Sequence, residues 1–199
     1  MILAAGESSR MGTDKAMLPW PPGAVSQETF LSAAVRSLLP FNDLVIVVAG
    51  KNESTIAPVV YATNASIVRN PEPERGQFSS LQVGLQEVLN RGRDAAMITH
   101  VDRPPADGAT LAALRDAFVG LPDEKWALVP EFRGQHGHPI LVGRDMMEVF
   151  LKAPATAVAR EIEHQHQHHI EYLAVDDPRL TLNVNTPEEY AALLSGYRH

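Results

Sequence analysis

"DLVIVVAG", residues 43–50, is a continuous apolar run, rich in β-branched side chains, that ends in a glycine. Such a run is typical of a strand buried on both faces, as in a parallel sheet. The run "MILA" at residues 1–4 has the same character and ends just before Ala5-Gly6. Between them, residues 26–39 place small or apolar side chains on one helical stripe, namely Phe30, Ala33, Ala34, Ser37 and Leu38. A helix between two parallel strands makes a βαβ unit.

The alternation continues along the chain. We expect further strands at 65–70, 95–102, 126–132 and 170–177, helices at 79–91, 107–119, 144–153, 155–165 and 186–197, and a turn with a short strand within 133–143. This pattern predicts an α/β fold of three layers, α/β/α, around a doubly wound, mostly parallel sheet. Because the length suits one core, we expect residues 1–199 to form a single domain.

Composition narrows the class of protein. The formal net charge of −7 opposes non-specific binding to the nucleic-acid backbone, so a phosphate-bearing ligand must be small and held by local cations. The absence of cysteine excludes disulfides, thiolate zinc sites and cysteine nucleophiles. The longest purely apolar stretch, residues 44–49, is far shorter than the roughly 20 residues of a membrane span, and the start lacks a signal-peptide pattern. We therefore expect a cytoplasmic protein without nucleic-acid or membrane partners, as a monomer or weak dimer.

The loop after the first expected strand has the character of a phosphate site. In open α/β sheets, ligands lie at the carboxyl ends of the strands, which is where this loop begins. Gly6 and Gly12 allow the backbone to approach a ligand, and Arg10 and Lys15 supply positive charge. The loop is neither a Walker A sequence nor a G-x-G-x-x-G sequence. A polar connection whose cations face solvent explains its composition equally well.

Five segments together resemble a known family. Residues 3–15, "LAAGESSRMGTDK", resemble the signature L-A-A/G-G-x-S-x-R-M-G-x-x-K of the MobA-like nucleotidyltransferases, which include molybdenum-cofactor cytidylyltransferases and guanylyltransferases. The later matches, in order, are "RNPEPERGQFSSLQVGL" (69–85), "HVDRPP" (100–105), "GQHGHP" (134–139) and "LNVNTPEEY" (182–190). The resemblance implies a Rossmann-like nucleotidyltransferase fold. It also implies Mg²⁺-dependent transfer of a nucleoside monophosphate from an NTP to a phosphorylated acceptor, with release of pyrophosphate.

The resemblance also implies roles for residues. Arg10 and Lys15 would hold the triphosphate, and Asp102 would hold Mg²⁺, so these three are the expected catalytic residues. The expected nucleotide-binding residues are Leu3, Ala4, Ala5, Gly6, Ser8, Arg10, Gly12, Lys15, Asn70, Ser79 and Ser80. The alternatives are structural: Asp102 as a helix cap or salt-bridge partner, and the two serines as helix caps.

The closing segment departs from the cytidylyltransferase pattern. That pattern has two aspartates where this chain has Asn183 and Asn185, as guanylyltransferases often do. Asn185 is the second expected metal ligand, although an amide is a weaker magnesium ligand than a carboxylate. A protein that binds a nucleotide without catalysis is therefore an alternative.

In the opening segment, Ala4 and Ala5 match the cytidylyl type, and an alanine methyl narrows the pocket, so we expect CTP to be preferred over GTP.

The acceptor is expected to be the molybdopterin cofactor, with a sugar phosphate as the alternative. His138, in the "GHP" segment, is the expected acceptor-binding residue, although a structural turn histidine is the other interpretation.

The run of histidines within 164–169 would place three imidazoles on one face of a strand, but it lacks carboxylate or cysteine partners at ligand spacing, so we do not assign it a physiological metal. Trp20 lies either in a rigid lip near the site or in the core.

Overall fold

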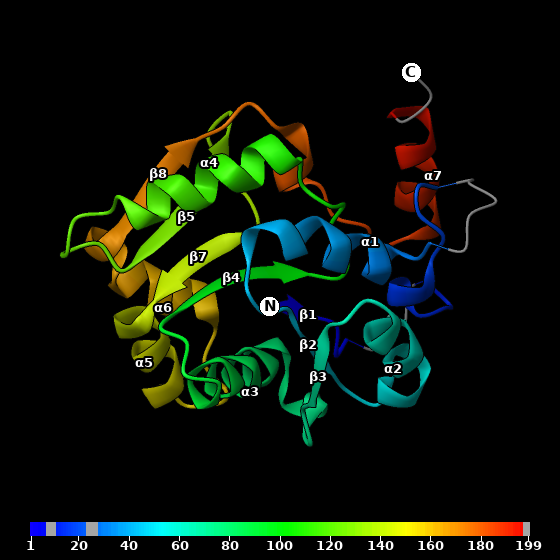
Figure 1. Ribbon diagram of the computed structural model, residues 1–199, viewed down its shortest axis with the longest axis horizontal. Coiled ribbons are helices and arrows are strands. Elements are labelled where there is room, and N and C mark those ends of the chain that lie inside the picture. Colours follow the sequence, from blue (N-terminus) through cyan, green and yellow to red (C-terminus); the bar gives the residue numbers. More distant parts are fainter. Residues whose placement is uncertain (7–10, 23–27, 197–199) are drawn as a thin grey trace.

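The computed structural model describes residues 1–6, 11–22 and 28–196, and its centre is one mixed sheet (Figure 1). The strand order is β3-β2-β1-β4-β7-β5-β6, and β8 pairs with β5. The strands are β1 (Ile2–Leu3), β2 (Ile46–Ala49), β3 (Ser66–Arg69), β4 (Ala95–His100), β5 (Ala127–Phe132), β6 (Gln135–His136), β7 (Ile140–Gly143) and β8 (Ile170–Ala174). The β3-β2-β1-β4 half is entirely parallel, whereas β7 runs antiparallel between β4 and β5.

Helices cover both faces of this sheet. Most buried apolar residues of α1 (Phe30–Leu38) and those of α2 (Glu53–Ala62) and α4 (Gly108–Val119) belong to one core cluster. Those of α3 (Gln77–Asn90), α5 (Arg144–Lys152) and α6 (Ala159–Gln165) belong to a second cluster on the opposite face. Figure 1 shows α1 and α4 on one side of the strands and α3 and α5 on the other. The expected three-layer α/β/α fold is therefore confirmed.

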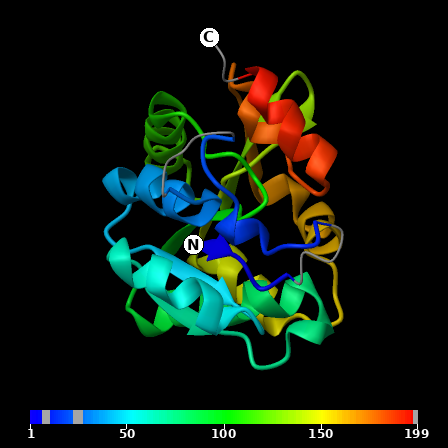
Figure 2. The ribbon, with the colours of Figure 1, turned by 90° about the vertical axis from the view of Figure 1, so that its right-hand side faces the viewer.

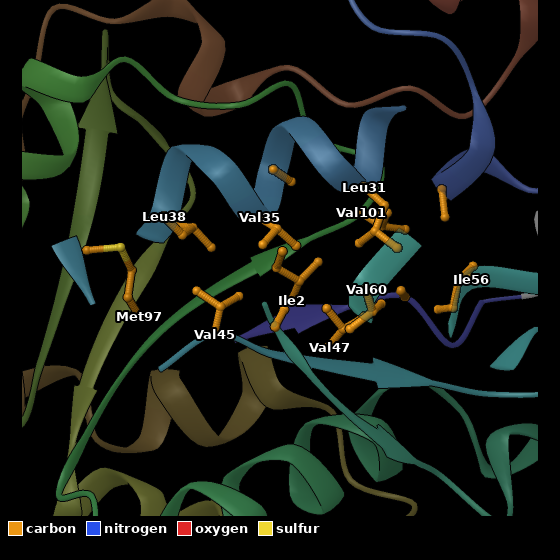
Figure 3. Packing of buried hydrophobic residues seen from close by; sticks show 14 of the residues in the cluster. Ile2, Leu31, Val35, Leu38, Val45, Val47, Ile56, Val60, Met97 and Val101 are labelled. Carbon is orange, nitrogen blue, oxygen red and sulfur yellow. The ribbon is translucent and has the colours of Figure 1, made fainter. Parts of the chain in front are cut away.

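The central strands are apolar on both faces because each face has its own core. Ile2 and Val47 pack into the cluster under α1, while the neighbouring residues Leu3 and Val48 pack into the cluster over α3. This alternation follows from the two-residue period of a strand. Figure 3 shows Val35 and Leu31 of α1 packed above Ile2 and Val47 of the sheet, with side chains of α2 beside them.

A third, smaller cluster joins the two ends of the chain. It contains the buried residues Met11, Leu18, Trp20, Phe30, Ala33 and Val184, with Tyr190 and Leu193 packed against it. The rings of Trp20 and Phe30 meet edge to face with 4.8 Å between their centroids. Trp20 is therefore part of a hydrophobic core, the second of the two interpretations of this residue. The Tyr190 hydroxyl of α7 (Pro187–Gly196) donates a hydrogen bond to the Pro19 carbonyl at 2.6 Å. The chain segment after β1 and the last helix therefore hold each other in place. Figure 2 shows both, in blue and in red, on the side of the molecule that faces the viewer.

The first helix and α2 are among the elements that differ from the sequence-based expectation. The first helix begins at Phe30 rather than at 26, because Thr29 caps it and exchanges hydrogen bonds with Ser32. Helix α2 was not expected, since Pro58 interrupts its pattern. Ile56 and Val60, four residues apart, are fully buried in the core under α1, and this packing outweighs the cost of the proline.

The histidine run is not a strand. His164 lies in α6, and His168 and His169 lie in the 3₁₀ turn η4 (Gln167–His169) that follows. The ring of His169 stacks on Trp126 at 3.3 Å between centroids, and its Nδ1 contacts the Glu124 carbonyl at 2.7 Å. Within the described ranges, no helix has the length and apolar character to cross a membrane, and no group of three His, Cys, Asp or Glu side chains could hold a metal ion.

Candidate active site

A pocket of about 440 Å³ opens at the carboxyl ends of β1 and β4. Its walls come from four parts of the chain: the segment after β1, the start of α3, the end of β4 and the segment before α7. The lining residues are Leu3, Ala5, Gly6, Lys15, Pro73, Gly76, Gln77, Ser80, His100, Val101, Asp102 and Asn185. This is the edge at which ligands bind in open α/β sheets.

Three polar side chains from distant parts of the sequence converge in this pocket. Lys15 Nζ donates a hydrogen bond to Asn185 Oδ1 at 3.0 Å and lies 3.4 Å from Asp102 Oδ2. The Lys15 side chain is only 12% exposed, while that of Asp102 is 29% exposed. The two oxygens thus hold the Lys15 ammonium between them in the lining of the pocket.

The turn that presents Lys15 is fixed from the neighbouring strand. Lys15 begins the 3₁₀ turn η1 (Lys15–Met17), which Asp14 caps by accepting a hydrogen bond from the Ala16 amide at 3.0 Å. The Asn52 side chain, just after β2, donates to Asp14 Oδ2 at 2.8 Å and to the Ala4 carbonyl at 2.9 Å. These bonds tie the turn to the carboxyl ends of β1 and β2, so Lys15 is held in position.

The segment that carries Asn185 is fixed by a helix cap and by the β4 end. The Val184 amide donates to the Asp102 carbonyl at 2.7 Å. Glu189 Oε2 accepts from the Asn185 amide at 2.5 Å and from the Thr186 amide at 3.2 Å, and Thr186 Oγ1 accepts from the Glu189 amide at 3.2 Å. The "NTPEE" segment is therefore the capping box of α7, and its geometry sets the position of Asn185.

A buried polar cluster supports the opposite wall. Asn70, which is 2% exposed, donates hydrogen bonds to Ser79 Oγ and Ser80 Oγ, both at 2.9 Å. Ser79 in turn donates to the Gly76 carbonyl at 2.7 Å. Ser80 reaches the pocket, whereas Asn70 and Ser79 stand behind it and fix the turn into α3. Gly76 has a φ of 99°, which favours glycine at that turn.

Two histidines meet beside the pocket. His100, the last residue of β4, lines the pocket, and its Nδ1 is in hydrogen-bond contact with Gln77 Nε2. The ring of His138 lies edge-on to His100 at 4.6 Å, and its Nδ1 is 3.4 Å from the Ile98 carbonyl. His138 is not among the pocket-lining residues; it stands behind His100.

Burial keeps both rings neutral. Removal from water lowers the pKa of His100 to about 4, with Asp102 opposing and Arg103 adding to the shift. Burial likewise lowers the pKa of His138 well below its ordinary value, and the charges of His100 and Arg103 act in the same direction. Neutral imidazoles can exchange hydrogen bonds with a ligand but add no positive charge.

The oxygen atoms in the pocket suit a hard cation. Mg²⁺ prefers oxygen ligands and is usually held in proteins by one or two carboxylates together with phosphate oxygens and waters. Asp102 supplies a carboxylate oxygen and Asn185 an amide oxygen. Both oxygens contact the Lys15 ammonium. The donor set therefore fits a magnesium ion.

The other residues expected at the site fall in different places. Leu3, Ala5 and Gly6 line the pocket, while Ala4 is buried and bonds to β2 through its amide. Gly12 has a φ of 67° and belongs to the segment before Lys15, outside the pocket lining. Ser8 and Arg10 lie outside the described residues.

Gln77 and His100 are pocket residues that the sequence analysis did not single out. His100 is present in the matched segment "HVDRPP", two residues before Asp102. A strand presents alternate residues on the same side, so that spacing was the available signal. No sequence signal pointed to Gln77, because its contact with His100 is between α3 and β4, which are separate in sequence and meet only in the folded chain.

A model of the MobA-like NTP transferase domain matches residues 1–170. The chain belongs to this family of nucleotidyltransferases. Among relatives of the MobA-like chain, the molybdenum cofactor cytidylyltransferase of Escherichia coli (strain K12) is 26% identical over 198 residues, which cover 99% of this chain and 95% of the relative. A probable molybdenum cofactor guanylyltransferase of Rhodopirellula baltica is 29% identical over 197 residues, which cover 95% of this chain and 88% of the relative.

Solved structures share the fold of this MobA-like chain. The crystal structure of Rv0371c from Mycobacterium tuberculosis H37Rv has a TM-score of 0.81 at 26% identity, covering 98% of this chain and 95% of that one. A complex of Rv0371c with manganese has a TM-score of 0.77 at 23% identity, with 98% and 96% coverage. The resemblance inferred from the motifs is thus confirmed at the level of the family and the fold.

Proposed function

We propose that this chain transfers a nucleoside monophosphate, CMP in preference to GMP, from an NTP to the molybdopterin form of the molybdenum cofactor and releases pyrophosphate. The observation that carries the proposal is the convergence of Lys15, Asp102 and Asn185 in one pocket at the carboxyl edge of the sheet. The similarity to the cytidylyltransferase and guanylyltransferase relatives supports the choice of acceptor.

The chain's own groups act by positioning and by neutralising charge. Nucleotidyl transfer places an acceptor oxygen in line with the α-phosphorus, and negative charge grows on the departing pyrophosphate. Lys15, which lines the pocket, pairs with that charge, and Arg10 is its expected companion. Leu3, Ala5 and Gly6 line the wall that borders the nucleotide in this proposal. Ser80 and the cluster behind it shape the opposite wall.

Asp102 and Asn185 are the proposed magnesium ligands. The bound ion would supply charge that draws the phosphate oxygens together and stabilises the leaving group. The contacts of the Lys15 ammonium with both oxygens support a cation at this position. A manganese complex of Rv0371c, a chain of the same fold, supports a divalent ion as cofactor. Lys15 must then exchange at least its Asp102 contact for a phosphate contact when the nucleotide binds.

Base preference rests on the wall beside β1. Ala5 lines the pocket. A Cβ atom added at Gly50, just after β2, would lie 2.7 Å from the Ala5 carbonyl oxygen and 3.2 Å from the Ala5 Cβ, so the chain packs closely between the ends of β1 and β2. The methyl of Ala5 has little room to move away from a base, which supports a preference for the smaller pyrimidine. We also propose that residues 1–199 act as one nucleotidyltransferase domain.

The test is release of pyrophosphate with Mg²⁺ and molybdopterin cofactor, with CTP and GTP in direct competition at equal concentration. We expect turnover that depends on the metal and at least tenfold more CMP than GMP transfer, a difference of about 1.4 kcal/mol. A tenfold preference for GTP would overturn the base assignment alone. Nucleotide binding without release, for this cofactor and for sugar phosphates, would point to a binding protein instead.

A further inference from the structure

The pocket wall between the phosphate end and α3 carries a neutral hydrogen-bonding pair, Gln77 and His100. The two side chains meet through Gln77 Nε2 and His100 Nδ1, although they are 23 residues apart in sequence. An amide nitrogen only donates hydrogen bonds, so His100 Nδ1 is the acceptor. In a neutral imidazole with an accepting Nδ1, the proton is on Nε2. The pair therefore fixes His100 as a donor through Nε2.

That donor is open to the pocket. Among the described residues, the only hydrogen bond of the His100 ring is the one to Gln77, and no buried side-chain nitrogen or oxygen lacks a partner. His100 Nε2 is therefore accessible, and the space that His100 borders is the pocket. Behind it, the edge-on ring of His138, whose Nδ1 lies 3.4 Å from the Ile98 carbonyl, limits how far the His100 ring can swing.

The position of His100 selects one part of a nucleotide. Lys15, Asp102 and Asn185 form the charged end of the pocket, and His100 lies two residues before Asp102 on the same chain segment. In an NTP the pentose is joined directly to the α-phosphate, so the first uncharged group met beyond the phosphates is the sugar. A neutral donor at that point suits a hydroxyl oxygen better than a phosphate oxygen, for which a cation is the stronger partner.

We propose that His100 donates a hydrogen bond from Nε2 to a ribose hydroxyl of the bound nucleotide, and that Gln77 acts as a positioning residue by holding its tautomer. This inference rests on the proposed function, because it requires an NTP in this pocket. It makes His100 a residue that distinguishes ribonucleotides from deoxyribonucleotides.

The experiment measures nucleotide affinity by calorimetry, with Mg²⁺ and without acceptor, so that no turnover is needed. CTP is compared with 2′-deoxy-CTP and 3′-deoxy-CTP, and the corresponding GTP series is run in parallel. For the wild-type chain we expect one of the two deoxy analogues to bind about tenfold more weakly, as loss of a hydrogen bond to a desolvated donor predicts.

Three variants locate the source of that penalty. His100→Leu removes the donor and should weaken CTP about tenfold while abolishing the difference between CTP and the deoxy analogue. His100→Gln, whose Nε2 can reach a similar point, should retain part of the difference. Gln77→Leu changes an exposed side chain and should reduce the difference about threefold by releasing the tautomer. Gln86→Leu on the exposed side of α3, and His164→Leu in α6, are matched controls and should behave as wild type.

The outcomes separate this inference from the function on which it rests. If His100→Leu and Gln77→Leu keep the wild-type deoxy penalty, or if the wild-type chain shows no penalty, the ribose assignment is wrong while nucleotide binding stands. If CTP affinity is unchanged in His100→Leu, His100 faces the acceptor instead, and the assignment is again wrong. If neither CTP nor GTP binds to the wild-type chain, the proposed function itself is wrong, and the inference falls with it.

Discussion

Two aspartate–cation pairs in this molecule differ in how completely they are satisfied. Asp177, which is 4% exposed, accepts from Arg179 Nε and the Arg179 amide, both at 3.0 Å, from Thr110 Oγ1 at 3.1 Å and from the Asp107 amide at 3.3 Å. The Asp102 carboxylate, by contrast, has a contact of 3.4 Å to Lys15 and is 29% exposed.

The difference is the one expected between a structural pair at Asp177 and the proposed ligand-binding pair at Asp102. A saturated carboxylate has its oxygens used by the fold, here joining β8 to the start of α4 through the segment 175–179. A carboxylate with a long, partly exposed contact keeps room for another partner. Burial raises the pKa of Asp177, but the hydrogen bonds from the Arg179 side chain and backbone and from Asp107 outweigh it and hold the pKa below its ordinary value.

The largest effect expected is on turnover at Asp102. Asp102→Asn removes the carboxylate proposed to hold Mg²⁺ and should lower kcat by at least about 1000-fold, or about 4 kcal/mol in the barrier. Stability should change little, because partly exposed ion pairs contribute only about 0–1 kcal/mol. Metal-dependent pyrophosphate release and thermal melting measure the two effects. A large loss of stability with residual activity would show that Asp102 is structural, like Asp177.

Asp177→Asn should show the reverse pattern. The substitution leaves donors near Asp177 without a carboxylate, and we expect a loss of about 2–3 kcal/mol of unfolding free energy. Nucleotide affinity should be unchanged where the variant is folded, since Asp177 is not a pocket residue. Urea denaturation and calorimetry measure these quantities. A stability equal to wild type would remove the contrast between the two pairs.

Lys15→Ala should weaken NTP binding by about tenfold, because a charge-assisted contact to phosphate is lost. The fold should persist, since Lys15 is in a turn and its pair is with a partly exposed carboxylate. Lys152→Ala, which removes an exposed i,i+4 pair with Glu148 on α5, is the matched control. Calorimetric titration with CTP and Mg²⁺ distinguishes them, and equal affinities would take Lys15 out of the site.

Acid should act through the structural pair. The pKa of Asp177 in the folded state is below the ordinary 3.8. The ionised carboxylate therefore stabilises the fold above pH 3.8, and this contribution is lost as the pH falls through the lower pKa of the folded state. The difference in unfolding free energy between wild type and Asp177→Asn should therefore shrink when the pH is lowered from 5 to about 3. Urea titrations at each pH measure it, and a difference that stays constant would contradict the assignment.

The smallest effect is expected at Asn185, the proposed second metal ligand. Asn185→Asp supplies the carboxylate that the cytidylyltransferase pattern has there, and it should leave turnover unchanged or raise it a few-fold. Magnesium titrations of activity should give half-saturation at an equal or lower concentration. A variant that needs more magnesium would show that the amide contact to Lys15, rather than a metal, determines the residue at 185.

The sequence by itself determined the layers of the fold and the family. Apolar runs such as 43–50 and the ordered motifs carry that information locally, because strand period, helix stripe and glycine placement are properties of neighbouring residues. The tertiary structure alone decided that α2 forms despite Pro58, that the histidine run ends in a turn stacked on Trp126, and that His100 rather than His138 faces the pocket. Each depends on contacts between residues far apart in the chain. Lys15 and Asn185 are 170 positions apart in sequence, and the sheet, the third cluster and the cap of α7 bring them together.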